Sequence, residues 1–169
     1  MTWRVTVLPA LSVLALTFAA ILPWGLPSDY RFVLPLLPVV AIYYWTRDDA
    51  AWLPEWVLFL CGLLLDVLTQ GPLGYWALVY LVAYIAAVYA SRSAIESPRG
   101  KVALFTTAII SVTFFAWLAA SAYFLELLDW KPYARGAFFA LILAALVQLA
   151  LVIAKPSKSA TSLHLTRGD

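Results

Sequence analysis

The chain is short of charged residues, since Asp, Glu, Lys and Arg together make up only 12% of its 169 residues. An ordinary globular domain carries about 25% of such residues. Because 64% of the chain is hydrophobic, too few polar side chains remain to cover a core in water. The composition therefore excludes a water-soluble domain and indicates a protein whose solvent is lipid.

Cysteine and histidine are each present only once, as Cys61 and His164. One cysteine excludes an internal disulfide, and with a single histidine it removes the usual zinc and thiol–imidazole sites. No other pattern points to catalysis, so we predict a protein that is not an enzyme, with no catalytic residue, metal or cofactor. The net charge of +2 is far from the basic surface that nucleic-acid binding requires, which excludes nucleic acid as a partner.

The few charges divide the chain into six apolar stretches, and we predict that each forms a transmembrane helix of an all-α bundle. Crossing the hydrocarbon core takes about 20 helical residues, so the shorter second stretch needs tilt or local thinning of the bilayer. The third is extended back to Ala50, which places Pro54 and Glu55 in its first part, where a missing donor and a negative charge are tolerated. The expected spans are 5–26, 31–46, 50–68, 73–91, 102–125 and 135–154, and a polar cytoplasmic tail follows at 155–169.

Lysine and arginine residues in the short loops predict the orientation of the bundle. With the N-terminus inside, eight of them fall on the cytoplasmic side and three on the outer side. We therefore expect both termini to be cytoplasmic. The first stretch follows Arg4 as in a signal peptide, but it is longer than a typical signal h-region, which favours a retained helix.

The third stretch carries unusual residues at helical spacing. Glu55, Phe59, Gly62, Asp66 and Thr69 recur at intervals of 4, 3, 4 and 3 residues, which places them on one helical face. We expect this face inside the bundle, with Gly62 allowing close approach of a neighbouring backbone and Asp66 held in protein. In this interpretation Asp66 organises a polar contact or pocket near the outer surface; in the alternative, it snorkels from the helix end or stabilises the following turn. The residues expected to face lipid are Val57, Leu58, Leu60, Leu64, Leu65 and Leu68.

The segment 69–74 is predicted to be a tight outer turn, in which Pro72 fixes φ and Gly71 and Gly74 permit conformations closed to other residues. The turn joins the third and fourth helices as an antiparallel hairpin. Two further outer segments, 126–135 and 29–31, carry charges. These charges either cluster around Asp66 or are solvated loop residues.

The order of these motifs resembles the bacterial rod-shape-determining protein MreD family. The resemblance rests on Pro35-Leu36-Leu37-Pro38, on a G-x-x-x-D motif and on a G-x-L-G turn. It implies a six-helix bundle with a fold similar to the substrate-binding subunits of energy-coupling-factor transporters. It also implies that the family motif marks structural or partner-interface positions, which are Gly62, Asp66, Gly71, Pro72 and Gly74.

The function that the resemblance implies is a non-enzymatic scaffold in the bacterial inner membrane, which maintains rod shape as part of the cell-elongation machinery. The implied partners are the transmembrane helix of MreC, the glycan polymerase RodA, a class B penicillin-binding protein, MreB and RodZ, the last two directly or indirectly, and membrane lipid. The alternative is a substrate-capture subunit of a vitamin-type transporter. The chain lacks a deep cluster of polar ligand-binding groups, which favours the scaffold.

Overall fold

The computed structural model describes residues 3–22, 25, 34–48, 53–93 and 97–154. In these ranges the chain forms six α-helices and one short 3-10 turn, and it has no strand, which confirms the all-helical prediction. The elements are α1 (Trp3–Ile21), η2 (Leu34–Leu36), α2 (Leu37–Asp48), α3 (Glu55–Thr69), α4 (Tyr75–Ser91), α5 (Pro98–Phe124) and α6 (Lys131–Ala154). The predicted cytoplasmic tail and the charged segment 29–31 lie outside the described residues.

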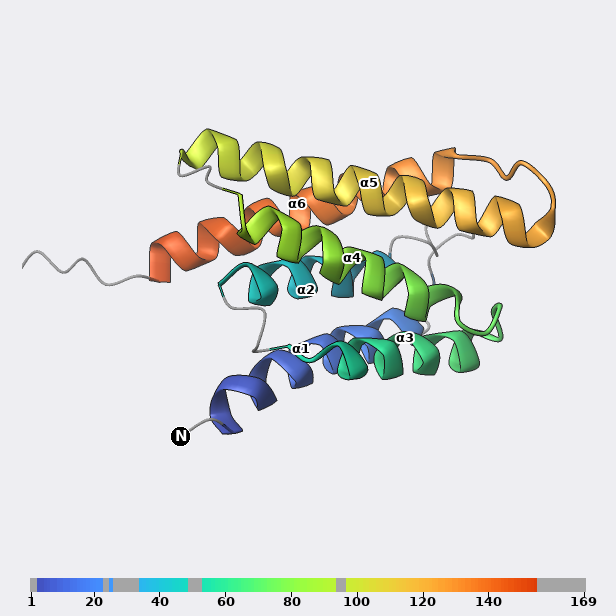
Figure 1. The fold of residues 1–169 in the computed structure, drawn as a ribbon, viewed down its shortest axis with the longest axis horizontal. Coiled ribbons are helices and arrows are strands. Elements are labelled where there is room, and N and C mark those ends of the chain that lie inside the picture. Colours follow the sequence, from blue (N-terminus) through green and yellow to red (C-terminus); the bar gives the residue numbers. More distant parts are fainter. Residues whose placement is uncertain (1–2, 23–24, 26–33, 49–52, 94–96, 155–169) are drawn as a thin grey trace, which may run out of the picture.

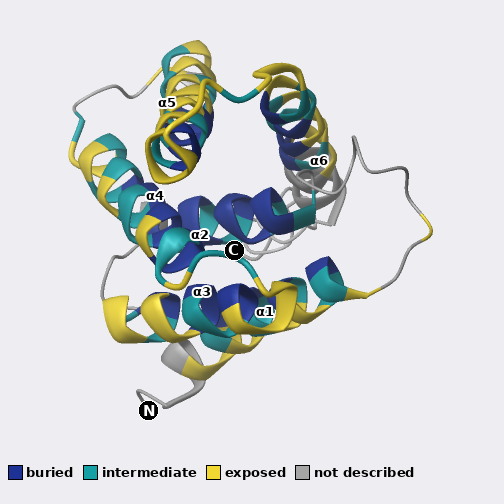
Figure 2. Cartoon of the chain, turned by 90° about the vertical axis from the view of Figure 1, so that its right-hand side faces the viewer, coloured by how far each residue is buried: buried dark blue, intermediate teal, exposed yellow. Residues whose placement is uncertain are grey.

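The helices lie in three layers of two, with α1 beside α3, α2 beside α4, and α5 beside α6 (Figures 1 and 2). The middle layer holds the bundle together, because α4 packs most extensively against α3 and α2 and also contacts α5. Successive helices run in opposite directions, so α3 ends where α4 begins, at the right of Figure 1. We call this the turn end of the bundle, and Figure 2 looks onto it.

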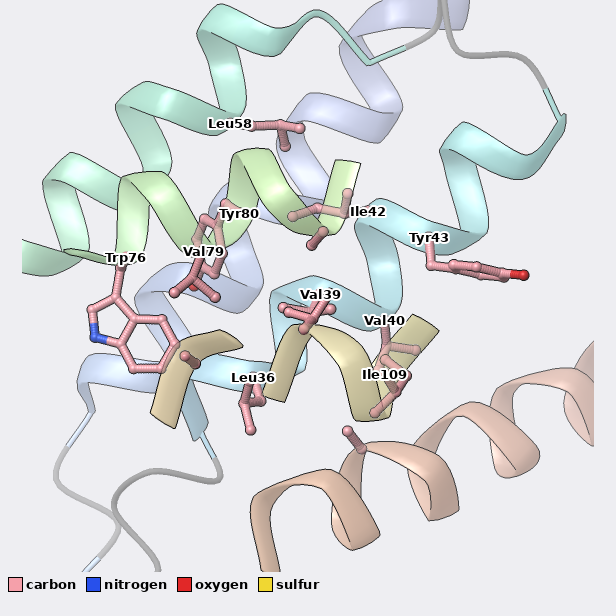
Figure 3. Packing of buried hydrophobic residues seen from close by; sticks show 14 of the residues in the cluster. Leu36, Val39, Val40, Ile42, Tyr43, Leu58, Trp76, Val79, Tyr80 and Ile109 are labelled. Carbon is pink, nitrogen blue, oxygen red and sulfur yellow. The ribbon is translucent and has the colours of Figure 1, made fainter. Parts of the chain in front are cut away.

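The core lies around α2 and α4, where side chains from several layers meet (Figure 3). Ile42 of α2, Leu58 of α3 and Tyr80 of α4 are all fully buried. The Tyr80 hydroxyl donates to the Pro35 carbonyl oxygen at 3.0 Å, which links α4 to η2. A buried tyrosine hydroxyl needs such an acceptor, so this bond fixes the depth at which α4 sits against the start of α2.

Several helix boundaries differ from those predicted; the sixth helix, for example, begins at Lys131 and not at 135. Pro54 is the N-cap residue of α3, with extended backbone at φ −63° and ψ 140°, so it precedes the helix and does not lie in its first part. The first helix ends at Ile21 and not at the predicted residue 26. The fifth begins earlier than expected, because the Ser97 Oγ accepts a hydrogen bond from the Gly100 N–H at 3.1 Å and caps it.

One described helix, over Arg99–Phe124 of α5, is long and apolar enough to cross a membrane on its own. The helices over Val7–Ile21, Leu34–Thr46 and Tyr75–Ser91 are apolar but shorter. At about 1.5 Å per residue, the 15 residues of α3 span about 22 Å, less than the hydrocarbon core of about 30 Å. One helix that is long and apolar enough to cross a membrane does not establish six spans. The six-span arrangement therefore stays a prediction.

Candidate functional site

The backbones of α3 and α4 touch at Gly62, which is buried. A Cβ atom added there would overlap the backbone of Ala77 and would lie 2.7 Å from the carbonyl carbon of Trp76. Real Cβ atoms essentially never come this close to backbone. Only glycine therefore permits the observed separation of the two helices at this point.

One turn after Gly62, the Asp66 carboxylate is fully buried and binds the start of α4. Its Oδ2 accepts a hydrogen bond from the Gly74 N–H and its Oδ1 accepts one from the Trp76 N–H, each at 2.9 Å. The first N–H groups of a helix have no partner within the helix, and a negative charge is favourable beside them. The neighbouring helix α3 thus supplies the cap that Gly74, which has no side chain, cannot provide.

The turn between the two helices is tight, as predicted. The Gly71 N–H donates to the Asp66 carbonyl oxygen at 3.0 Å, and the Tyr75 N–H donates to the Pro72 carbonyl oxygen at 3.1 Å. The residues with left-handed backbone are Gln70, at φ 54°, and Gly74, at φ 89°. The expectation that Gly71 takes such a conformation is therefore wrong, because the helix-terminating αL position falls one residue earlier.

The predicted inner face of α3 is only partly right. Gly62 and Asp66 are buried as expected, but Glu55, Phe59 and Thr69 are exposed. Among the residues assigned to the outer face, Leu58 and Leu65 are instead completely buried. The face is rotated because α3 packs against α1 as well as α4, so its buried side runs along Leu58, Cys61, Gly62, Leu65 and Asp66.

Three described charges of the outer segment 126–135 lie on the exposed surface, whereas the Asp66 carboxylate is buried. The Asp66 carboxylate accepts its hydrogen bonds from the backbone N–H groups of Gly74 and Trp76. Glu126, Asp129 and Lys131 are exposed to solvent. For these three residues, the structure favours the alternative of solvated loop charges.

A cavity of about 610 Å³ opens at the turn end, beside the α3–α4 junction. It draws on α1, η2, α3, α4, α5 and α6, and none of its described lining residues is charged. Those residues are Ala20, Ile21, Leu22, Gly25, Leu34, Pro35, Leu68, Thr69, Gly71, Pro72, Tyr75, Trp76, Ala120, Phe124, Leu128 and Tyr133. The lining of this cavity is not readable from the sequence, because its wall is assembled from the ends of helices that are distant in sequence.

A second hollow, of about 560 Å³, lies between α5 and α6 and is almost wholly apolar. Small side chains of Thr113, Ala134 and Ala137 line it together with the exposed rings of Phe114 and Phe138. We call this the α5–α6 groove. Small residues between larger ones let another helix approach closely.

Within the described ranges, no group of three or more His, Cys, Asp or Glu residues is placed to hold a metal ion. Comparison with known proteins finds no matching family, no similar curated protein and no similar solved structure.

Proposed function

We propose that the protein is a non-enzymatic scaffold of the cell-elongation machinery, of the MreD type, in the bacterial inner membrane. The observation that carries the proposal is the junction between α3 and α4. Gly62 admits the α4 backbone, and the Asp66 carboxylate caps α4 through Gly74 and Trp76. Three of the positions on which the resemblance rests, Gly62, Asp66 and Gly74, thus hold α3 and α4 together as a hairpin. A scaffold needs such fixed helix packing to present a surface to its partners.

In this proposal the transmembrane helix of MreC docks in the α5–α6 groove. The groove contains no charged side chain among its described lining residues, which matches an uncharged membrane helix. Two of its aromatic side chains are more than half exposed, Phe114 at 60% and Phe138 at 61%, so a partner helix would bury apolar area there. The small side chains that line the groove allow the close helix contact on which helix association in membranes depends.

Co-purification with MreC tests the groove. Ala134→Trp places a large side chain in the groove, where it would clash with a docked helix. A steric cost of about 1 to 3 kcal/mol lowers the binding constant for MreC by roughly five- to 150-fold. The matched control is Ala122→Trp, which changes an exposed alanine of α5 outside the groove. We expect MreC to be lost from Ala134→Trp and retained by Ala122→Trp. Equal recovery of MreC with both variants would contradict the proposal that MreC docks in the groove.

Reporter fusions test the proposed orientation in the membrane. With both termini cytoplasmic, alkaline phosphatase fused after Gln70 or Trp130 is outside and should be active. The same enzyme fused after Ser97 follows α4 on the cytoplasmic side and should be inactive. The reverse pattern of activities would contradict the topology.

Deletion of the gene in the source organism tests the biological role. We expect rod-shaped cells to become round while isolated enzymatic reactions continue, because the protein assembles other components and performs no chemistry. Normal cell shape with normal insertion of lateral wall would contradict the proposal. Saturable vitamin uptake by the protein with an ATPase partner would instead support the substrate-capture alternative.

A further inference from the structure

Exposed apolar side chains line the cavity at the turn end or neighbour its lining residues in sequence. Leu22, Leu68 and Phe124 line the cavity and are themselves 56%, 45% and 57% exposed. Leu73 and Leu127, next in sequence to the lining residues Pro72 and Leu128, are 73% and 80% exposed. We call these side chains the apolar rim, and exposed apolar surface of this kind suits a hydrocarbon environment or an apolar ligand.

The wall of the cavity is built for a neutral ligand. Its polar side-chain groups are three hydroxyls and the Trp76 indole N–H, and two of the hydroxyls already donate to the protein. The Tyr75 hydroxyl donates to the Ala116 carbonyl oxygen at 2.9 Å, and the Thr69 Oγ1 donates to the Leu65 carbonyl oxygen at 2.7 Å. None of the described lining residues offers a charge to a phosphate, carboxylate or ammonium group. A charged ligand buried there would lose its hydration without a counter-charge.

The size of the cavity also fits a bound molecule. Small-molecule sites have volumes of roughly 300 to 1,000 Å³ and walls that are mostly apolar with a few polar groups, and this cavity has about 610 Å³. From the apolar rim, the uncharged wall and the volume together, we propose that the cavity binds the hydrocarbon tail of a membrane lipid. The lipid headgroup stays outside, beyond the rim. This inference rests on the proposed location of the chain in a membrane, but not on the scaffold role or on MreC.

Native mass spectrometry of the purified full-length protein tests the proposal. The protein is reconstituted into vesicles of phosphatidylethanolamine and phosphatidylglycerol, extracted in detergent and analysed for bound lipid. Ala120→Phe places a ring in the cavity wall, where Ala120 is 4% exposed. Leu68→Trp also narrows the cavity, and because Leu68 is half exposed this variant does not depend on repacking of the core. The control is Ala122→Phe, on an exposed site of α5 outside the cavity.

We expect the unaltered protein and Ala122→Phe to retain lipid, and each of the two cavity variants to retain at least about tenfold less, the change that 1.4 kcal/mol produces. Retention of the same amount by folded Leu68→Trp as by the unaltered protein would overturn the proposal. Absence of lipid from the unaltered protein would also overturn it, as would recovery of a water-soluble molecule in place of lipid. Equal loss from Ala122→Phe would mean that the lipid coats the helix surface and does not enter the cavity.

Discussion

Gly62→Ala is expected to lower the yield of folded protein sharply, although it adds only one methyl group. The new Cβ atom would overlap the Ala77 backbone and lie 2.7 Å from the Trp76 carbonyl carbon. Backbone cannot rotate away as a flexible side chain can, so α3 and α4 must separate. Overpacking typically costs about 1 to 3 kcal/mol and occasionally more, and a clash with backbone belongs at the upper end of that range.

The measurement is the temperature at which the detergent-solubilised protein aggregates, together with its level in the membrane. Gly71→Ala is the matched control, because its Cβ would meet only the Thr69 Oγ1, at the ordinary contact distance of 3.4 Å. We expect Gly71→Ala to behave almost as the unaltered protein. If Gly62→Ala has the same aggregation temperature as Gly71→Ala, then the α3–α4 contact is not as close as described.

Asp66→Leu is expected to insert into the membrane normally and to destabilise the start of α4. Charges at the centre of a membrane cost about 2.5 to 3.5 kcal/mol on insertion scales, so removing the carboxylate does not oppose insertion. The loss comes after folding, because the Gly74 and Trp76 N–H groups lose their acceptor. A buried donor left unpaired costs about 1 to 3 kcal/mol, and Trp76 is only 6% exposed.

Asp129 provides the control for this substitution. Its Oδ1 accepts a hydrogen bond from the Lys131 N–H at 3.1 Å at the start of α6, but the residue is exposed. Water can replace the lost carboxylate there, so Asp129→Leu should shift the aggregation temperature much less than Asp66→Leu. Asp66→Asn, which keeps one acceptor oxygen, should fall between Asp66→Leu and the unaltered protein. Equal aggregation temperatures for Asp66→Leu and Asp129→Leu would show that burial of the cap adds no stability.

Measuring both the aggregation temperature and the retention of MreC for Asp66→Leu separates an effect on stability from an effect on assembly. If Asp66→Leu folds stably but fails to retain MreC, then Asp66 belongs to a partner interface, as the resemblance implies. If Asp66→Leu loses stability and MreC retention in the same proportion, then the role of Asp66 is to hold the α3–α4 hairpin together. Ala134→Trp, in the α5–α6 groove, gives the comparison for a variant that affects docking without touching the α3–α4 junction.

Local sequence determined the number and order of the helices and several of their ends. The sparse charges delimit the apolar stretches. Ser97 and Pro98 act on neighbouring backbone, so the start of α5 is also determined locally, although the predicted start at 102 missed it. The close approach at Gly62 and the burial of Asp66 were also predictable, because a lone glycine and a lone carboxylate one turn apart stand out in an apolar helix.

Tertiary structure decided which way each apolar helix faces. Leu58 and Leu65 are buried while Leu60 and Leu68 are exposed, although all four are the same amino acid in one helix. Where the surroundings are as apolar as the core, hydrophobicity does not distinguish inside from outside. Neither the hydrogen-bond partners of Asp66 nor the residues of the cavity wall could be predicted from the sequence, because both depend on which helix ends meet. Packing of α3 between α1 and α4 selects the buried face and brings the N–H groups of Gly74 and Trp76 to the carboxylate.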